Sequence, residues 1–150
     1  MKNLFEPARV ADVKARIAML RPDSPRQWGK MTIGQMLAHC SIGFETANGT
    51  TRPPRALMGR LLGPMIKRMA VRDDGVMQKN SPTAKVFLIT GERDFTAERD
   101  RLVSHLDEFA AAGPASCTDH PHAFFGKMTP DEWAILMYKH VDHHLRQFGA

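Results

Sequence analysis

Residues 129–150, TPDEWAILMYKHVDHHLRQFGA, decide the fold of this chain. Thr129 is a typical N-cap residue, Pro130 suits the first helical position, and Glu132 completes a capping box with the threonine. Residues at spacings of three and four then form one stripe: Trp133, Leu136, Met137, His140, His144 and Phe148. The stretch predicts a helix over residues 130–147 whose apolar face packs into a core.

Four more segments with helical periodicity set the fold class. They are residues 7–20, residues 32–47, residues 55–71 and a segment from residue 94 or 95 to residue 112. Thr32 and Gln35 form a second capping box, and Gly63-Pro64 is expected to kink or divide the third segment. The pattern over residues 72–90 leaves both an extended and an ordered-loop conformation open. We expect an all-α bundle of four main helices with additional short helices or turns.

Composition indicates one domain over residues 1–150. The chain is 43% hydrophobic and 25% charged, which suits a single folded core. No apolar run approaches the roughly 18 residues of a membrane span, and the opening lacks the apolar run of a signal peptide. Cys40 and Cys117 show no disulfide or CxxC spacing, which fits a reducing compartment. We therefore expect a cytoplasmic protein with no membrane partner.

The net charge of +5 raises the question of nucleic-acid binding. Much of the excess lies in the middle segment, at Arg52, Arg55, Arg60, Lys67, Arg68 and Arg72. These residues interleave with leucines and methionines, a pattern typical of the solvated face of an amphipathic helix. Nucleic acid is therefore not an expected partner.

His140 and His144 lie in the middle of the C-terminal stripe and are candidate metal ligands. Residues four apart on a helix differ by only about 40° in direction, so both rings should point into the bundle together. Their Cβ atoms would lie roughly 5–6 Å apart, which lets both rings reach one ion at about 2.0–2.1 Å. The alternative is that each is a core histidine satisfied by hydrogen bonds within the protein.

A two-histidine site needs a further ligand, and His39 in the second helical segment is the best candidate. Spacing alone leaves open whether His39 lies at a seam of the bundle or on a partly exposed surface. Gln35, one turn earlier, is a candidate to line the same site, and His143 at the edge of the stripe is another. Cys40 as a nucleophile beside His39 is disfavoured, because adjacent helical residues point about 100° apart.

The two histidine-bearing regions together resemble the DinB-like superfamily. They are WGKMTIGQMLAHCS, residues 28–41, and HPHAFFGKMTPDEWAILMYKHVDHHLRQFG, residues 120–149. The resemblance covers nearly the whole chain and points to an uncharacterised branch. It implies a four-helix bundle of DinB type with metal ligands at His39, His140 and His144. The common His-His-Arg-Gly-Gln ending is replaced here by His143-His144-Leu145-Arg146-Gln147, which moves the arginine.

The resemblance also implies a class of chemistry. Members of this superfamily include metal-dependent transferases that join low-molecular-weight thiols to electrophiles, alongside proposed hydrolases. Three neutral imidazoles leave a coordination position open, as in catalytic sites. Zinc and nickel are the leading ions, and iron and manganese also fit the ligand type.

Our leading hypothesis from sequence is a metal-dependent thiol S-transferase acting on a small molecule. Gln35, His143 and Arg146 are its candidate substrate-binding residues. The alternatives are a metal-dependent hydrolase and a non-catalytic helical module for binding or dimerisation. A homodimer is compatible with all three.

Overall fold

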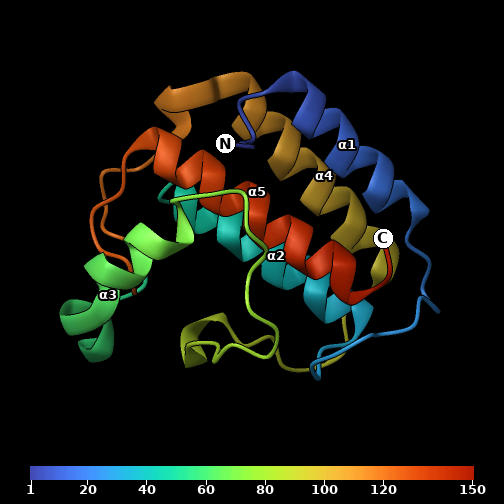
Figure 1. Cartoon of the computed structure of the whole chain (residues 1–150). Coiled ribbons are helices and arrows are strands. Elements are labelled where there is room, and N and C mark those ends of the chain that lie inside the picture. The colour runs from blue at the N-terminus through green and yellow to red at the C-terminus, as the bar shows by residue number, and fades with distance from the viewer.

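The computed structural model describes residues 1–150 and is entirely helical, as the sequence predicts (Figure 1). Five α-helices follow one another: α1 (Pro7–Met19), α2 (Ile33–Ala47), α3 (Leu57–Ala70), α4 (Phe95–Ala112) and α5 (Pro130–Gln147). Two short 3-10 helices, η1 (Lys85–Phe87) and η2 (Gly113–Ser116), lie in the connections. No helix is both long and apolar enough to span a membrane.

Four of the helices form a closed ring around one core. α1 packs on α4 and α5, and α2 packs on the same two helices from the other side. Figure 1 shows α3 outside this ring, at the end of α2 and α5. The largest fully buried side chains come from all four ring helices and include Ile17, Phe44, Leu102 and Trp133. Burial of each such side chain contributes about 1.5–3 kcal/mol.

Capping fixes where the two histidine-bearing helices begin. Thr32 accepts from the Gln35 backbone N–H, and the Gln35 side chain accepts from the Thr32 N–H. Thr129 and Glu132 make the same reciprocal pair at the start of α5. Both predicted capping boxes are confirmed, so the registers of α2 and α5 follow from local sequence.

Helix α3 departs from the expected pattern in two ways. Pro64 does not divide it, and the carbonyl left without a helical hydrogen-bond partner belongs to the exposed residue Arg60. Its basic side faces solvent as expected, but Leu57 and Leu61 are also 81% and 78% exposed. The only buried residues of the helix are Gly59 and Gly63, so its small side rather than its apolar side packs on the protein.

Residues 71–94, which join α3 to α4, cross the face of the bundle where α2 and α5 meet (Figure 1). Their backbone is irregular apart from η1, and side chains of the ring hold it in place. Lys139 of α5 donates to the carbonyls of Ala70 and Asp73, and Gln35 of α2 donates to the carbonyl of Gly91. We call residues 71–91 the crossing segment.

Candidate metal centre

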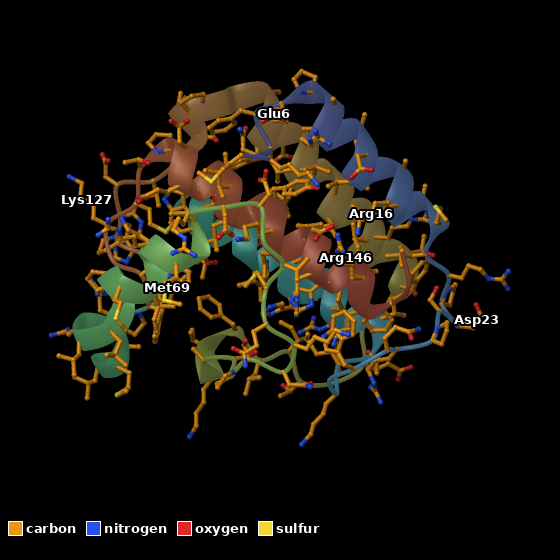
Figure 2. The ribbon with its side chains drawn as sticks, in the orientation of Figure 1. Glu6, Arg16, Asp23, Met69, Lys127 and Arg146 are labelled. Atoms are coloured by element: carbon orange, nitrogen blue, oxygen red, sulfur yellow. The ribbon has the colours of Figure 1, made fainter.

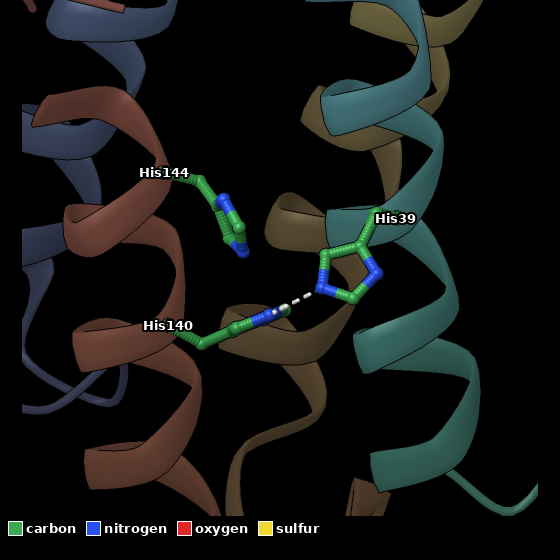
Figure 3. Close-up of side chains that lie close together, drawn as sticks. All are labelled: His39, His140 and His144. Carbon is green, nitrogen blue, oxygen red and sulfur yellow. Dashed lines mark hydrogen bonds between the residues drawn. The ribbon is translucent and has the colours of Figure 1, made fainter. Parts of the chain in front are cut away.

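Helices α2 and α5 bring His39, His140 and His144 together between them (Figure 3). One ring nitrogen from each histidine lies within 4.8 Å of those of the other two. The ring centroids are 4.8–4.9 Å apart in every pair. His39 and His144 are buried, whereas His140 is partly exposed. The structure thus gathers the three residues that the sequence proposed as ligands, including His39, whose direction spacing did not decide.

Hydrogen bonds on the outer side of two rings determine which nitrogen faces the centre. Nδ1 of His39 donates to the carbonyl of Phe87 at 3.0 Å, and Nδ1 of His144 donates to Oε1 of Gln147 at 2.9 Å. The Gln147 amide is itself oriented, because its nitrogen donates to the carbonyl of Trp28 at 2.7 Å. In a neutral ring with a protonated Nδ1, Nε2 carries a free lone pair. His39 and His144 therefore both carry a free lone pair on Nε2, the nitrogen that could bind a metal ion.

The rings of His140 and His39 approach each other at nearly the separation expected for two ligands of one metal ion. Nε2 of His140 lies 3.0 Å from Nε2 of His39, the dashed contact in Figure 3. Since the His39 nitrogen is an acceptor, either His140 donates a proton across this contact or a cation lies between the two lone pairs. Nitrogens in a tetrahedral zinc site, with bonds of about 2.0–2.1 Å, lie about 3.3 Å apart. The donor set therefore fits a divalent ion.

Burial keeps these rings neutral and so keeps their lone pairs available. It lowers the pKa of His39 against the opposing effect of the Phe87 carbonyl, and it lowers the pKa of His144 to about 3. Burial, followed by the charges of the neighbouring histidines, places the pKa of His140 well below its ordinary value. Protons therefore compete weakly with a cation for these nitrogens near neutral pH.

Gly43 provides the space that His140 occupies. It lies on α2 one turn after His39, and a Cβ atom there would stand 3.2 Å from Nδ1 of His140 and 2.9 Å from Cε of Met137. The absence of a side chain at this position lets α5 approach α2 closely. A glycine at i+4 from a ligand histidine is thus part of the geometry of the centre.

Two of the three predicted substrate-binding residues lie beside the centre without contacting its nitrogens in the structure. The Gln35 side chain completes the cap of α2 and donates to the carbonyl of Gly91. The His143 ring packs against Trp28, with centroids 5.4 Å apart. Burial lowers the pKa of His143, and a hydrogen bond to the backbone of Met77 opposes this effect. Both side chains therefore help to hold the crossing segment.

Arg146 lies on another side of α5. Its Nε donates to Asp142 at 2.8 Å, and Arg16 of α1 donates to the other oxygen of the same carboxylate at 2.7 Å. Figure 2 shows Arg16 and Arg146 near each other at the α1 side of α5. The structure therefore does not bring Arg146 to the imidazoles, and a role in substrate binding has no support from these contacts.

Two partners of the centre are absent from the residues singled out by sequence, Gln147 and Phe87. Gln147 lies at i+3 from His144, and this spacing is a signal for a side-chain contact on a helix. Gly29, at φ +79, leaves room for the Gln147 amide that a Cβ would displace. Phe87 acts through its carbonyl from a position 48 residues away in the sequence, so no side-chain pattern could have indicated it.

His122 lies in an aromatic environment next to the centre. Its ring stacks on Phe125 with centroids 4.7 Å apart and packs on Phe87 and Trp133 at 6.4 and 5.5 Å. Nδ1 accepts two backbone N–H groups at 3.1 Å, from Phe124 and Phe125. Burial, with a smaller effect of Arg55, lowers the pKa of His122 to about 4. This histidine is a neutral structural anchor for the loop before α5.

One hollow of the surface is remote from these histidines. It measures about 440 Å³, lies between α1 and α4, and is lined by Phe5, Pro7, Val10, Ala11, Lys14, Asp107 and Ala110. Its only charged groups, Lys14 and Asp107, pair with each other at 2.7 Å. It offers no ligand set, so the three-histidine centre is the better candidate for the functional site.

Among the comparisons with known proteins, only the comparison with protein families gives a match. The chain matches no curated protein and no solved structure. One family matches residues 6–150, and its description is "Protein of unknown function (DUF1569)". The match spans all five helices and the three histidines. The chain therefore belongs to the DUF1569 family.

Proposed function

We propose that this protein is a metal-dependent enzyme of DinB-like type that transfers a small-molecule thiol to an electrophile. The observation that carries the proposal is the convergence of three imidazoles, two of which have their outer nitrogens held by Phe87 and Gln147. Such outer partners are typical of metal-binding histidines. No carboxylate joins the triad within ligand distance. The resemblance of the histidine-bearing regions to DinB-like transferases gives the reaction class.

His39, His140 and His144 would hold zinc or nickel, and this ligand type would also admit iron or manganese. A bound ion supplies Lewis acidity, which lowers the pKa of a thiol and yields a nucleophile near neutral pH. The chain's own residues orient the ligands, through Phe87 and Gln147, and limit the access of water. The crossing segment contacts the buried ring of His39 through the Phe87 carbonyl, and His140 is the least buried residue of the three.

The thiol must come from a substrate, because neither cysteine of the chain is suited to react. Cys40 is completely buried, and burial raises the pKa of its thiol far above its ordinary value. Burial also raises the pKa of the Cys117 thiol, which lies against the carbonyl of Pro130. Reactive cysteines have lowered pKa values instead. A low-molecular-weight thiol is therefore the expected cosubstrate.

Metal analysis of purified protein tests the centre. We expect about one divalent ion per chain in the wild type, as for a single three-ligand catalytic site, and its loss in His39→Ala, His140→Ala and His144→Ala with helicity retained. His120→Ala is the matched control, since this loop histidine contacts only Pro53 and Thr118 through the hydrogen bonds that it makes. Stoichiometric metal in all three ligand variants would reject the assignment.

Activity assays test the reaction. Metal-loaded protein should consume low-molecular-weight thiols in the presence of an electrophile, with no turnover when the thiol is omitted, and His140→Ala should be inactive. Cleavage of esters or amides without any thiol would show a hydrolase instead. Metal-free wild type, with a stability that a chelator does not change, would support a non-catalytic helical module.

A further inference from the structure

Helix α3 exposes a set of large apolar side chains that the fold does not use. Their exposed fractions are 81% for Leu57, 78% for Leu61, 61% for Met69, 60% for Met58 and 59% for Met65. At about 100° per residue they occupy a single arc of about 120° on the helix. A contiguous exposed apolar surface of this kind marks an interaction site.

The opposite side of α3 is already fixed to the protein. Gly59 and Gly63 pack on the loop before α5 so closely that a Cβ at either position would overlap the carbonyl oxygen of Phe124. Lys67 ties the same helix to Glu132 at 2.8 Å. Figure 2 shows Met69 on α3, outside the ring of four helices. The helix therefore cannot turn its apolar arc inward without breaking these contacts, and they keep the arc facing outward.

The charged residues of α3 itself are all basic. Residues 46–72 contain no aspartate or glutamate and six basic residues, Arg52, Arg55, Arg60, Lys67, Arg68 and Arg72. Arg60 and Arg68 are exposed on α3 itself: Arg60 lies beside the arc, and Arg68 lies within it in the last turn of the helix. Long arginine side chains can extend from an apolar surface to place their charge at its border. The partner that complements this face is apolar in its interior and negatively charged at its surface.

A second copy of the chain fits this face poorly. A two-fold dimer would place the two basic helices against each other, because both copies contribute the same patch to such an interface. A folded protein partner is also a weaker match. The arc carries no aromatic residue, whereas protein interfaces concentrate their energy in tryptophan, tyrosine and arginine. Leucine and methionine next to arginine need only an apolar layer and an anionic surface.

We propose that α3 docks the protein on an anionic lipid surface, with its apolar arc inserted at the level of the lipid headgroups. Amphipathic helices with a basic polar side lie in the plane of a membrane interface in this way, and their binding depends on both apolar area and anionic lipid. This docking is peripheral, and it requires no helix able to span the bilayer.

Sedimentation of the full chain with vesicles tests the proposal. The protein should bind vesicles of phosphatidylcholine with phosphatidylglycerol, and binding should weaken as salt is raised or when phosphatidylglycerol is left out. The double substitution Leu61→Gln with Met65→Gln should reduce binding about tenfold or more, since it removes apolar area at the centre of the arc. Arg60→Gln with Arg68→Gln should weaken binding to the anionic vesicles selectively.

Met19→Gln is the matched control, because Met19 of α1 is 69% exposed but lies on another helix. It should bind vesicles like the wild type. Circular dichroism and metal content should be the same in all variants, which separates this surface from the histidine centre. Absence of binding, or equal binding by the Leu61→Gln and Met65→Gln double variant, would overturn the proposal. So would a wild-type dimer that this double variant makes monomeric.

Discussion

Two of the three clustered histidines have a hydrogen-bond partner at the ring nitrogen that faces away from the cluster. A neutral imidazole can present either nitrogen, and the choice costs little in water. In this protein the Phe87 carbonyl fixes the choice for His39, and the Gln147 side chain fixes it for His144. His140 has no such partner, and its Nδ1 faces Gly43. The centre thus combines two preset ligands with one whose proton can move between its nitrogens.

Substitution of Gln147 tests this outer support. Gln147→Leu removes the acceptor from the Nδ1–H of His144, so this buried ring loses its preferred tautomer. Loss of such a partner typically weakens metal affinity about 10–100-fold, and we expect an effect in that range. Competition titration with a chromophoric chelator measures it. Gln27→Leu, which removes a hydrogen bond to Pro25 at an exposed site, should leave the affinity unchanged.

Substitution of His122 tests the origin of acid sensitivity. Its pKa is about 4 in the folded protein and near 6.5 when unfolded, so the unfolded chain binds the proton more tightly. The stability that comes from the neutral ring is therefore complete above about pH 6.5 and is lost as pH falls toward 4, by at most about 3 kcal/mol. Protonation at Nδ1 would also end its hydrogen bonds from Phe124 and Phe125.

His122→Asn should flatten this pH dependence, because the asparagine oxygen can accept the same two N–H groups without titrating. Thermal unfolding at pH 7 and pH 4.5 measures the difference. The wild type should lose more stability between these values than the variant does. Equal losses would show that His122 does not contribute to the acid sensitivity.

The sequence predicted the part of the centre that lies on one helix. His140 and His144 share a face because four residues make slightly more than one helical turn. The inward direction of His39 depends on how α2 is rotated against α5, and the pattern of one helix does not contain that rotation. The crossing segment reaches His39 over a long stretch of irregular chain, so its contribution required the folded structure.

At the scale of elements, α5 was the most predictable helix and α3 the least. The start of α5 is encoded by Thr129, Pro130 and Glu132, all within its first turn. The apolar pattern of α3 correctly predicts a helix. It does not predict which side of the helix packs on the rest of the protein. In the structure that side is formed by Gly59 and Gly63, not by the large apolar side chains. Small residues allow close backbone approach, which competes with burial of larger side chains.

A methyl group at Gly63 tests how α3 is attached. In Gly63→Ala the new Cβ would collide with the carbonyl oxygen of Phe124, which belongs to the backbone and cannot rotate away. We expect α3 to be displaced and the loop before α5 to loosen, with a loss of stability of about 1–3 kcal/mol. Chemical denaturation and proteolysis of native protein measure these effects. Gly75→Ala, where the new atom meets only the end of the exposed Asp73 side chain and no backbone atom, should cost much less.

At the scale of the whole molecule, the ring of helices sets the distance between the two ligand-bearing elements. α2 and α5 contact each other directly, and each also packs on α4 or α1. Ion pairs reinforce these junctions: Arg101 of α4 pairs with Glu45 of α2, and Arg16 of α1 pairs with Asp142 of α5. Packing and ion pairs therefore set the positions of the three histidines, and we expect this helical frame to form without metal.

Removal of metal tests how far the centre contributes to stability. A cation held by His39 from α2 and by His140 and His144 from α5 would bind the folded chain and not the unfolded one, because only folding brings these residues together. At a free concentration about 1,000 times the dissociation constant it would add about 4 kcal/mol to the free energy of unfolding. For a chain of this size that corresponds to a rise in Tm of roughly 10 °C.

Calorimetry of wild-type protein before and after chelation should show this shift, and addition of zinc should restore the higher Tm. His140→Ala should unfold near the temperature of the chelated wild type and should respond to neither treatment, because two imidazoles bind the ion too weakly to be saturated. The far-ultraviolet circular dichroism should be the same in all samples, since the helical frame closes through its apolar core. A chelated protein without helical structure would instead show that the bundle needs the metal in order to fold.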